Sequence, residues 1–216
     1  MILLYILGGL IAYIVVGQIL VRFILADRYP DIGSYFRTGD VLNSNYEGFT
    51  ITITRQEKGL VYGTLVMQPH AAGPPEHRHL NFDELFAIEN GTATLMHKGQ
   101  TRALLPGEEV LIKKGEAHKF YNETDEPIRV KGEFQFPEKF AFMLTQLYGF
   151  MDEYPDFEKS PKVMMQIPLF QQNGFDSYIA GPPVPMQKFM GLLFSPLARL
   201  LGYRSYYQKY TPQRKG

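Results

Sequence analysis

The chain of 216 residues has room for one domain of ordinary size plus flanking segments. Its formal net charge is zero, with 22 Lys and Arg residues against 22 Asp and Glu residues, so the overall charge gives no sign of a nucleic-acid partner. The absence of cysteine excludes disulfide bonds and thiolate metal ligands.

The first 21 residues are almost purely apolar, with Gln18 as the one strongly polar side chain and Arg22 as the first charge. A helix needs about 20 such residues to cross the bilayer core. A cleaved signal peptide would open with basic residues, and none precedes the apolar run. We therefore predict a transmembrane helix over residues 1–25. A buried helix, or an apolar arm that docks on a partner barrel, is the alternative.

Basic residues follow this predicted span, at Arg22, Arg28 and Arg37, and none precedes it. The positive-inside tendency then places the remainder of the chain in the cytoplasm, as a single-pass membrane protein. Residues 26–37 contain a proline and a glycine close together and are interpreted as a linker.

Short strands dominate residues 38–138. Residues 49–54 alternate strictly between apolar and polar side chains, as expected for a half-buried strand. Turn signals recur at short intervals, at Asn90-Gly91, Lys98-Gly99, Pro106-Gly107 and Lys114-Gly115. We predict strands at residues 49–54, 61–68, 85–89, 92–97, 101–105, 109–112 and 118–122, and a further strand from residue 128. Regular spacing of this kind favours a mainly β fold, an antiparallel barrel or jelly roll.

Three of the five histidines are candidate metal ligands. His77 and His79 lie two apart, so in an extended strand both imidazoles point to the same face. Glu84 can join them from the start of the next strand, and His118 follows a glycine turn further along. Three nitrogens and one carboxylate on one face suit a divalent metal ion.

The spacing of these residues is distinctive. From His77 the sequence runs through His79, then four residues to Glu84 and six more to Gly91. This resembles the first motif of the cupin superfamily, which runs Gly, five residues, His-x-His, three or four residues, Glu, six residues, Gly. The leading glycine, Gly73, is slightly out of step because only three residues separate it from His77.

A second stretch runs from Gly107 through five residues to Lys113-Lys114-Gly115, two residues to His118 and three to Asn122. It resembles the second cupin motif, in which a proline stands where this chain has Lys113. The resemblance covers roughly residues 38–138. It implies a β-barrel with a metal ion in its mouth, held by the residues named above, and it does not imply a reaction. A homodimer is a further family-level expectation.

The ligand set of His77, His79, Glu84 and His118 contains no thiolate, which favours Fe(II), Mn(II) or Ni(II) over a structural zinc. Four protein ligands on an octahedral ion leave two positions for substrate, water or dioxygen, and Glu84 could alternate between ligand and catalytic base. The alternative is a barrel that keeps the motif only for packing, at the cost of burying charged groups without metal.

Strand parity predicts which neighbours face the metal. If Glu84 points inward, Phe86 and Ile88 should too, and the same argument joins Phe120 to His118. The substrate pocket is then apolar and aromatic, which suits a hydrophobic small molecule better than a sugar phosphate. That these three side chains are simply barrel core is an equal alternative.

Residues 139–216 change to helical spacing, with helices expected at 140–151 and 161–170 and an apolar, basic segment at 186–203. The last forty residues have six basic and no acidic side chains, namely Lys188, Arg199, Arg204, Lys209, Arg214 and Lys215. An interfacial helix on anionic membrane lipid would have this composition. A C-terminal helix packed on the barrel with a solvated basic tail would have it too.

The leading functional hypothesis is a membrane-anchored, metal-binding cupin that acts as an oxygen-dependent enzyme, a metal-dependent dioxygenase, on a small hydrophobic or aromatic molecule. Its ligand set resembles that of the quercetinase-like cupins. A non-catalytic module that binds or senses a small ligand is the alternative. An isomerase or epimerase is the third hypothesis, and the scarcity of inward basic residues weighs against it.

Overall fold

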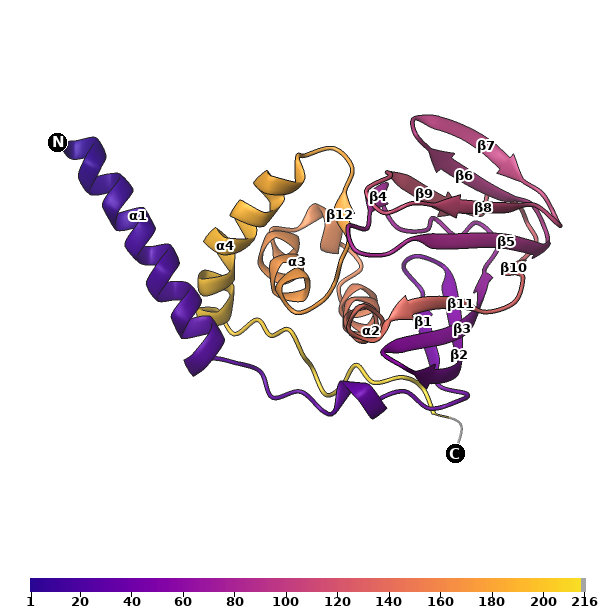
Figure 1. The fold of residues 1–216 in the computed structure, drawn as a ribbon, viewed down its shortest axis with the longest axis horizontal. Helices are drawn as coiled ribbons and strands as arrows, with labels where there is room; N and C mark the ends of the chain where they lie inside the picture. Colours follow the sequence, from indigo (N-terminus) through magenta and orange to yellow (C-terminus); the bar gives the residue numbers. More distant parts are fainter. Residues whose placement is uncertain (215–216) are drawn as a thin grey trace.

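Two antiparallel β-sheets and a group of helices make up the computed structural model, which describes residues 1–214 without the side chain of Glu158 (Figure 1). The larger sheet has the strand order β1-β2-β3-β10-β5-β8, with β11 also paired to β3. Its strands are β1 (Val41–Ser44), β2 (Phe49–Glu57), β3 (Leu60–Met67), β5 (Glu84–Asn90), β8 (Glu109–Ile112), β10 (Ile128–Val130) and β11 (Phe134–Pro137).

The smaller sheet has the order β12-β4-β9-β6-β7. Its strands are β4 (His77–Arg78), β6 (Ala93–His97), β7 (Gln100–Leu104), β9 (His118–Tyr121) and β12 (Tyr178–Ile179). The strands predicted from the sequence are present with small shifts at their ends. The short strands β1, β11 and β12 were not predicted.

The two sheets pack on each other through a shared core. Phe86 of β5 stacks on Phe120 of β9 with ring centroids 4.4 Å apart, which joins the two sheets directly. Buried apolar residues of both sheets, including Ile51 and Leu95, belong to one hydrophobic cluster. The predicted class, a mainly β antiparallel jelly roll with an N-terminal apolar helix and C-terminal helices, is confirmed.

One glycine explains how the chain turns into β4. Gly73 has φ of +61°, and a Cβ atom built there would lie 2.1 Å from the carbonyl oxygen of Phe120. A side chain at this position is therefore incompatible with the close approach of the two backbones. The glycine that stood out of step in the sequence motif is required by the turn that delivers His77 to the sheet.

The helices lie on one side of the sheets, in the order α2, α3, α4 and α1 outward from them (Figure 1). They comprise α2 (Glu138–Glu153), α3 (Lys162–Gln172) and α4 (Val184–Leu200), with short 3-10 turns at Ile32–Ser34 and Phe157–Lys159. The predicted helices over 140–151 and 161–170 correspond to α2 and α3. The C-terminal region is not only helical, because β12 returns from it to pair with β4.

The N-terminal helix α1 (Ile2–Ile19) continues into a π-helical turn (Leu20–Ile24). Together they are long and apolar enough to cross a membrane by length and composition, and little of their surface is buried. Sufficient length and apolar composition are found in membrane-spanning helices and in signal sequences alike. The last turns of α1 pack on α4, where Tyr13 donates a hydrogen bond to the carbonyl of Leu193 at 2.9 Å.

Residues 26–37, interpreted as a linker, are packed against the body of the protein. Tyr35 and Phe36 are buried in the hydrophobic core. Asp27 forms a buried ion pair with Arg199 at 2.7 Å, which ties the end of the N-terminal helix to α4. The predicted basic tail residue Lys215 lies outside the described residues.

Candidate metal centre

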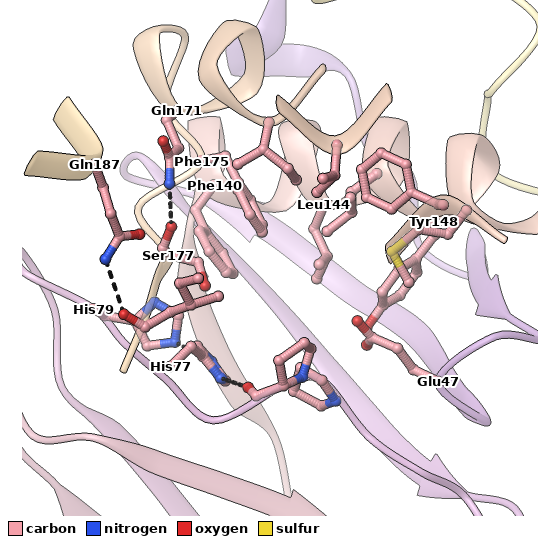
Figure 2. Close-up of a pocket in the computed structure, with 18 of the residues that line it drawn as sticks. Glu47, His77, His79, Phe140, Leu144, Tyr148, Gln171, Phe175, Ser177 and Gln187 are labelled. Carbon is pink, nitrogen blue, oxygen red and sulfur yellow. Dashed lines mark hydrogen bonds between the residues drawn. The ribbon is translucent and has the colours of Figure 1, made fainter. Parts of the chain in front are cut away.

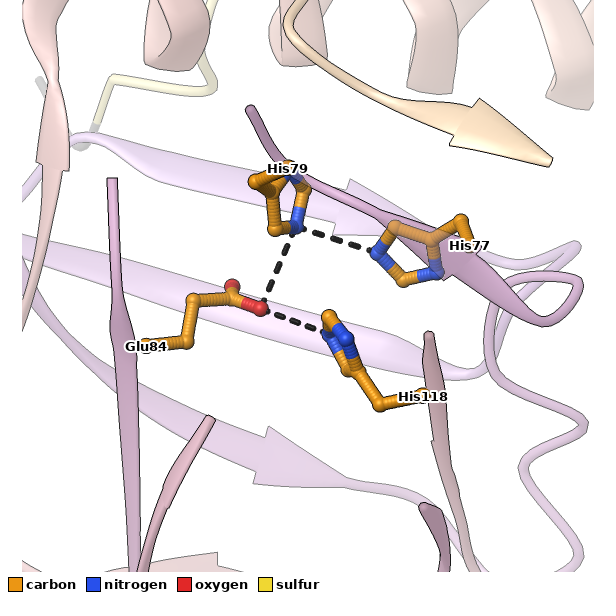
Figure 3. Close-up of side chains that lie close together, drawn as sticks. All are labelled: His77, His79, Glu84 and His118. Carbon is orange, nitrogen blue, oxygen red and sulfur yellow. Dashed lines mark hydrogen bonds and ion pairs between the residues drawn. The ribbon is translucent and has the colours of Figure 1, made fainter. Parts of the chain in front are cut away.

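Four side chains converge at one point between the sheets, as Figure 3 shows. One ligand atom from each of His77, His79, Glu84 and His118 lies within 4.8 Å of all the others. The Oε2 atom of Glu84 is 2.8 Å from Nε2 of His118 and 3.1 Å from Nε2 of His79. The Nε2 atoms of His77 and His79 are 3.1 Å apart. The structure therefore brings together all four residues that the sequence proposed as ligands.

The strands account for this convergence. His77 opens β4 and lies directly opposite His118, the first residue of β9, in the antiparallel register. His79 follows β4 immediately, and Glu84 is the first residue of β5 in the other sheet. The cluster thus joins the two sheets at the ends of three strands. All three histidines are buried, and His118 is only 1% exposed.

Each imidazole is oriented by its outer ring nitrogen. The Nδ1 atom of His77 lies 2.9 Å from the carbonyl oxygen of Pro75, and that of His118 lies 3.2 Å from the carbonyl of Glu116. The Nδ1 atom of His79 bonds to the carbonyl of Asp176. A backbone carbonyl can only accept, so each Nδ1 carries a proton and each Nε2 faces the centre, where it could give its lone pair to a bound metal ion.

Electrostatics in the cluster follow from burial and from the single carboxylate. Burial, reinforced by the neighbouring histidines, lowers the pKa of His77 to about 3, so its imidazole is neutral. Burial alone would also lower the pKa of His79, but the charge of Glu84 and its hydrogen bond outweigh burial and raise it. Burial would raise the pKa of Glu84, and the positive charge on His79 together with hydrogen bonds from both histidines holds it well below its usual range.

This donor set fits a divalent metal ion. Three imidazole nitrogens and one carboxylate oxygen, each oriented by neighbouring groups, are the usual ligands of iron, manganese, nickel and zinc. Without a metal ion, the carboxylate of Glu84 is paired with a positively charged His79 in a buried site, and burying such charges is costly. His77, His79, Glu84 and His118 are therefore the residues that would hold the metal.

A cavity of about 620 Å³ opens directly from the cluster (Figure 2). The sheet side of its wall includes Phe86 and Phe120, and the helical side includes Phe140, Leu144 and Phe175. This volume is ordinary for a small-molecule site. Among the described lining residues there is no lysine or arginine.

Of the three residues predicted to line the pocket, two do and one does not. Phe86 and Phe120 line the cavity beside the cluster. Ile88 is fully buried in the core, as strand parity allows, but it does not line the cavity, which corrects its assignment to the pocket. Phe86 is the last residue of β5 that lines the cavity, and Ile88 lies further along the strand.

Sequence reasoning missed the helical half of this site. Phe140, Leu144 and Tyr148 recur every four residues on α2 and face the cavity together. That period was visible in the sequence, although nothing in it showed that this face meets the metal ligands. Buried Glu47, from the loop between β1 and β2, lines the cavity as well, and burial together with its charge raises the pKa of Tyr148.

Comparison with known proteins agrees with the fold and the motifs. Residues 63–131 match the family model described as Cupin domain. Two curated relatives, each named probable oxidoreductase patJ, come from Penicillium expansum and Aspergillus clavatus and are each 24% identical to this chain. The matches cover 64% and 68% of this chain, and they span 46% and 49% of the relatives' own lengths.

Solved structures similar to this chain include KdgF from Halomonas sp., at 20% identity over 49% of this chain and 94% of that one, with a TM-score of 0.39. A cupin-2 domain protein from Shewanella frigidimarina is 21% identical over 40% of this chain and 78% of that one, with a TM-score of 0.33. The family match identifies residues 63–131 as a cupin domain.

Proposed function

We propose that this protein is a metal-dependent cupin, held at a membrane by α1, that carries out an oxygen-dependent oxidation of a small hydrophobic or aromatic molecule. The observation that carries the proposal is the cluster of three histidines and Glu84 at the wall of a large apolar cavity. The name probable oxidoreductase, which both curated relatives bear, supports a redox reaction.

Each part of the site has a role in this proposal. His77, His79, Glu84 and His118 hold the metal, and a bound divalent ion would supply Lewis acidity and open coordination positions for substrate. Oε2 of Glu84 lies 2.8 and 3.1 Å from Nε2 of His118 and His79, and the Glu84 carboxylate could also take a proton from a substrate hydroxyl. The aromatic walls exclude water, which strengthens each electrostatic interaction inside the cavity.

A second candidate function is non-catalytic binding or sensing of the same kind of molecule. The apolar inner end of the cavity, lined by buried side chains such as Phe120, favours it, because a ligand could be retained there without reaction. A sugar isomerase is disfavoured by the lack of lysine and arginine among the described lining residues, since a phosphate would call for them.

Oxygen uptake separates the first two functions. Full-length protein, reconstituted anaerobically with iron, manganese or nickel, is mixed with a panel of phenols, catechols and aromatic carbonyl compounds in an oxygen electrode. An enzyme consumes oxygen with one of these compounds, and Glu84→Ala abolishes the uptake. The matched control is Glu89→Ala, because this exposed carboxylate lies on the same strand as Glu84 and pairs with Arg129 outside the cluster. A binder raises its melting temperature with a compound and consumes no oxygen, a result that would overturn the enzyme proposal.

A further inference from the structure

The cavity that starts at the metal cluster runs between the helices to the protein surface. Its inner end is formed by buried residues of the cluster, including His79. At its other end stand three lining side chains that are largely exposed, namely Met164 at 43%, Ile179 at 49% and Met186 at 49%. They come from α3, β12 and the start of α4, so the opening lies on the helical side of the molecule.

Two glutamine side chains stand on the wall of the passage near its opening, and both of their amide NH2 groups donate to backbone carbonyls. Gln171 donates its side-chain amide to the carbonyl of Ser177 at 2.7 Å. Gln187 donates to the carbonyls of Ile179 and Pro182 at 2.9 and 2.8 Å. Figure 2 shows the bonds of Gln171 to Ser177 and of Gln187 toward the β12 backbone. Because these amides are engaged with backbone carbonyls, the route from the opening to the cluster is suited to hydrocarbon.

Helix α4 presents apolar side chains on two faces. Met186, Met190 and Phe194 lie four residues apart and line the cavity. Phe189 and Leu200 are exposed on the outer surface of the same helix, 46% and 65% accessible. The wall of the passage is therefore continuous with an exposed apolar surface outside it.

The same helix contacts the candidate membrane span. A Cβ atom at Gly17 would lie 2.5 Å from Cγ of Pro196, so the two helices approach closely there. Gln18 donates to the carbonyl of Leu192 and to Oγ of Ser195, both at 2.9 Å. With α1 in a bilayer, these contacts hold α4 and the opening beside the membrane surface.

We propose that the passage admits a long-chain amphiphile laterally from the bilayer, with an oxygen-bearing head group at the metal cluster and its hydrocarbon tail between α3 and α4. This names the substrate class of the site, and it rests on the membrane part of the proposed function. A water-soluble aromatic molecule would need neither the length of the passage nor an apolar opening at a membrane surface.

Photo-crosslinking in lipid nanodiscs tests the proposal. The probe is hexadecanoic acid with a diazirine in its chain, which partitions into the bilayer and carries a carboxylate head group. Labelled positions in the full-length protein are mapped by peptide mass spectrometry. We expect labels on α1 and on inner-wall residues such as Leu144. Met190→Trp fills the passage and should abolish the inner label, whereas the matched control Leu200→Trp, at a position of the same helix that is 65% exposed and outside the cavity, should keep it.

Labels confined to α1 and the outer face of α4 would refute the proposal that an amphiphile enters the passage. An inner label that persists equally in Met190→Trp would refute it too. If Met190→Trp does not fold, Met164→Trp narrows the same opening from α3. Metal content is measured on the same nanodiscs, so a failure of the passage can be distinguished from a failure of the proposed metal function. Protein without metal that is labelled inside keeps the passage and loses the metal function, while unlabelled α1 contradicts the membrane anchor.

Discussion

Asp176 is expected to control the affinity of the site for metal, although it is not a ligand. Its backbone carbonyl accepts the hydrogen bond from Nδ1 of His79. Its carboxylate accepts from the backbone N–H groups of Leu80 and Asn81 at 2.9 and 2.7 Å, which fixes this carbonyl against the ligand strand. Asp176→Ala keeps this carbonyl but removes both charge-assisted hydrogen bonds that hold it against the ligand strand, so the orientation of His79 is less firmly fixed.

Loss of such supporting contacts typically weakens metal binding about 10- to 100-fold, or roughly 1.4–2.8 kcal/mol. We expect a weakening in this range for Mn(II), measured anaerobically by the electron paramagnetic resonance signal of the free ion. The matched control is Asp125→Ala, which removes another aspartate paired with a histidine, at an exposed site away from the cluster. Unchanged Mn(II) affinity in Asp176→Ala would refute the idea that this segment positions His79.

Three further predictions concern the helical part of the molecule. Asp27→Ala leaves the buried guanidinium of Arg199 without its carboxylate and should destabilise the protein by about 3–5 kcal/mol. A double variant that also carries Arg199→Met should recover the lost stability, and melting curves of the single and double variants measure this. Gly17→Leu forces α1 away from Pro196 and should reduce disulfide cross-linking between cysteines introduced into α1 and α4 of this cysteine-free chain. Phe142→Ala empties a fully buried position and should cost about 3–5 kcal/mol, as measured by denaturant unfolding.

The convergence of the four candidate metal ligands could be predicted from the sequence because local geometry determines most of their arrangement. The spacing of His77 and His79 places both imidazoles on one face, and turns with fixed lengths set Glu84 and His118 at the starts of their strands. The strands themselves followed from alternation and glycine turns. These signals act over a few residues, so a single sequence contains them in full.

The rest of the site depends on contacts that are distant in sequence. Asp176 meets His79 across 97 residues of chain, and no local pattern indicates this pairing. The period of four on α2 and α4 showed an apolar face and left open what that face covers. Strand parity indicated that Ile88 faces inward, and it is fully buried, but parity gave no measure of how far along β5 the cavity extends, so Ile88 does not line it.

Metal content of the purified full-length protein tests the central claim most directly. Wild-type protein is compared with His118→Ala and with His97→Ala, whose side chain lies opposite His118 in the ladder and pairs with Glu116 outside the cluster. We predict stoichiometric iron, manganese or nickel in the wild type and in His97→Ala, and loss of the metal in His118→Ala. Wild-type protein that remains free of metal after anaerobic reconstitution, or His118→Ala that retains it in full, would contradict the account.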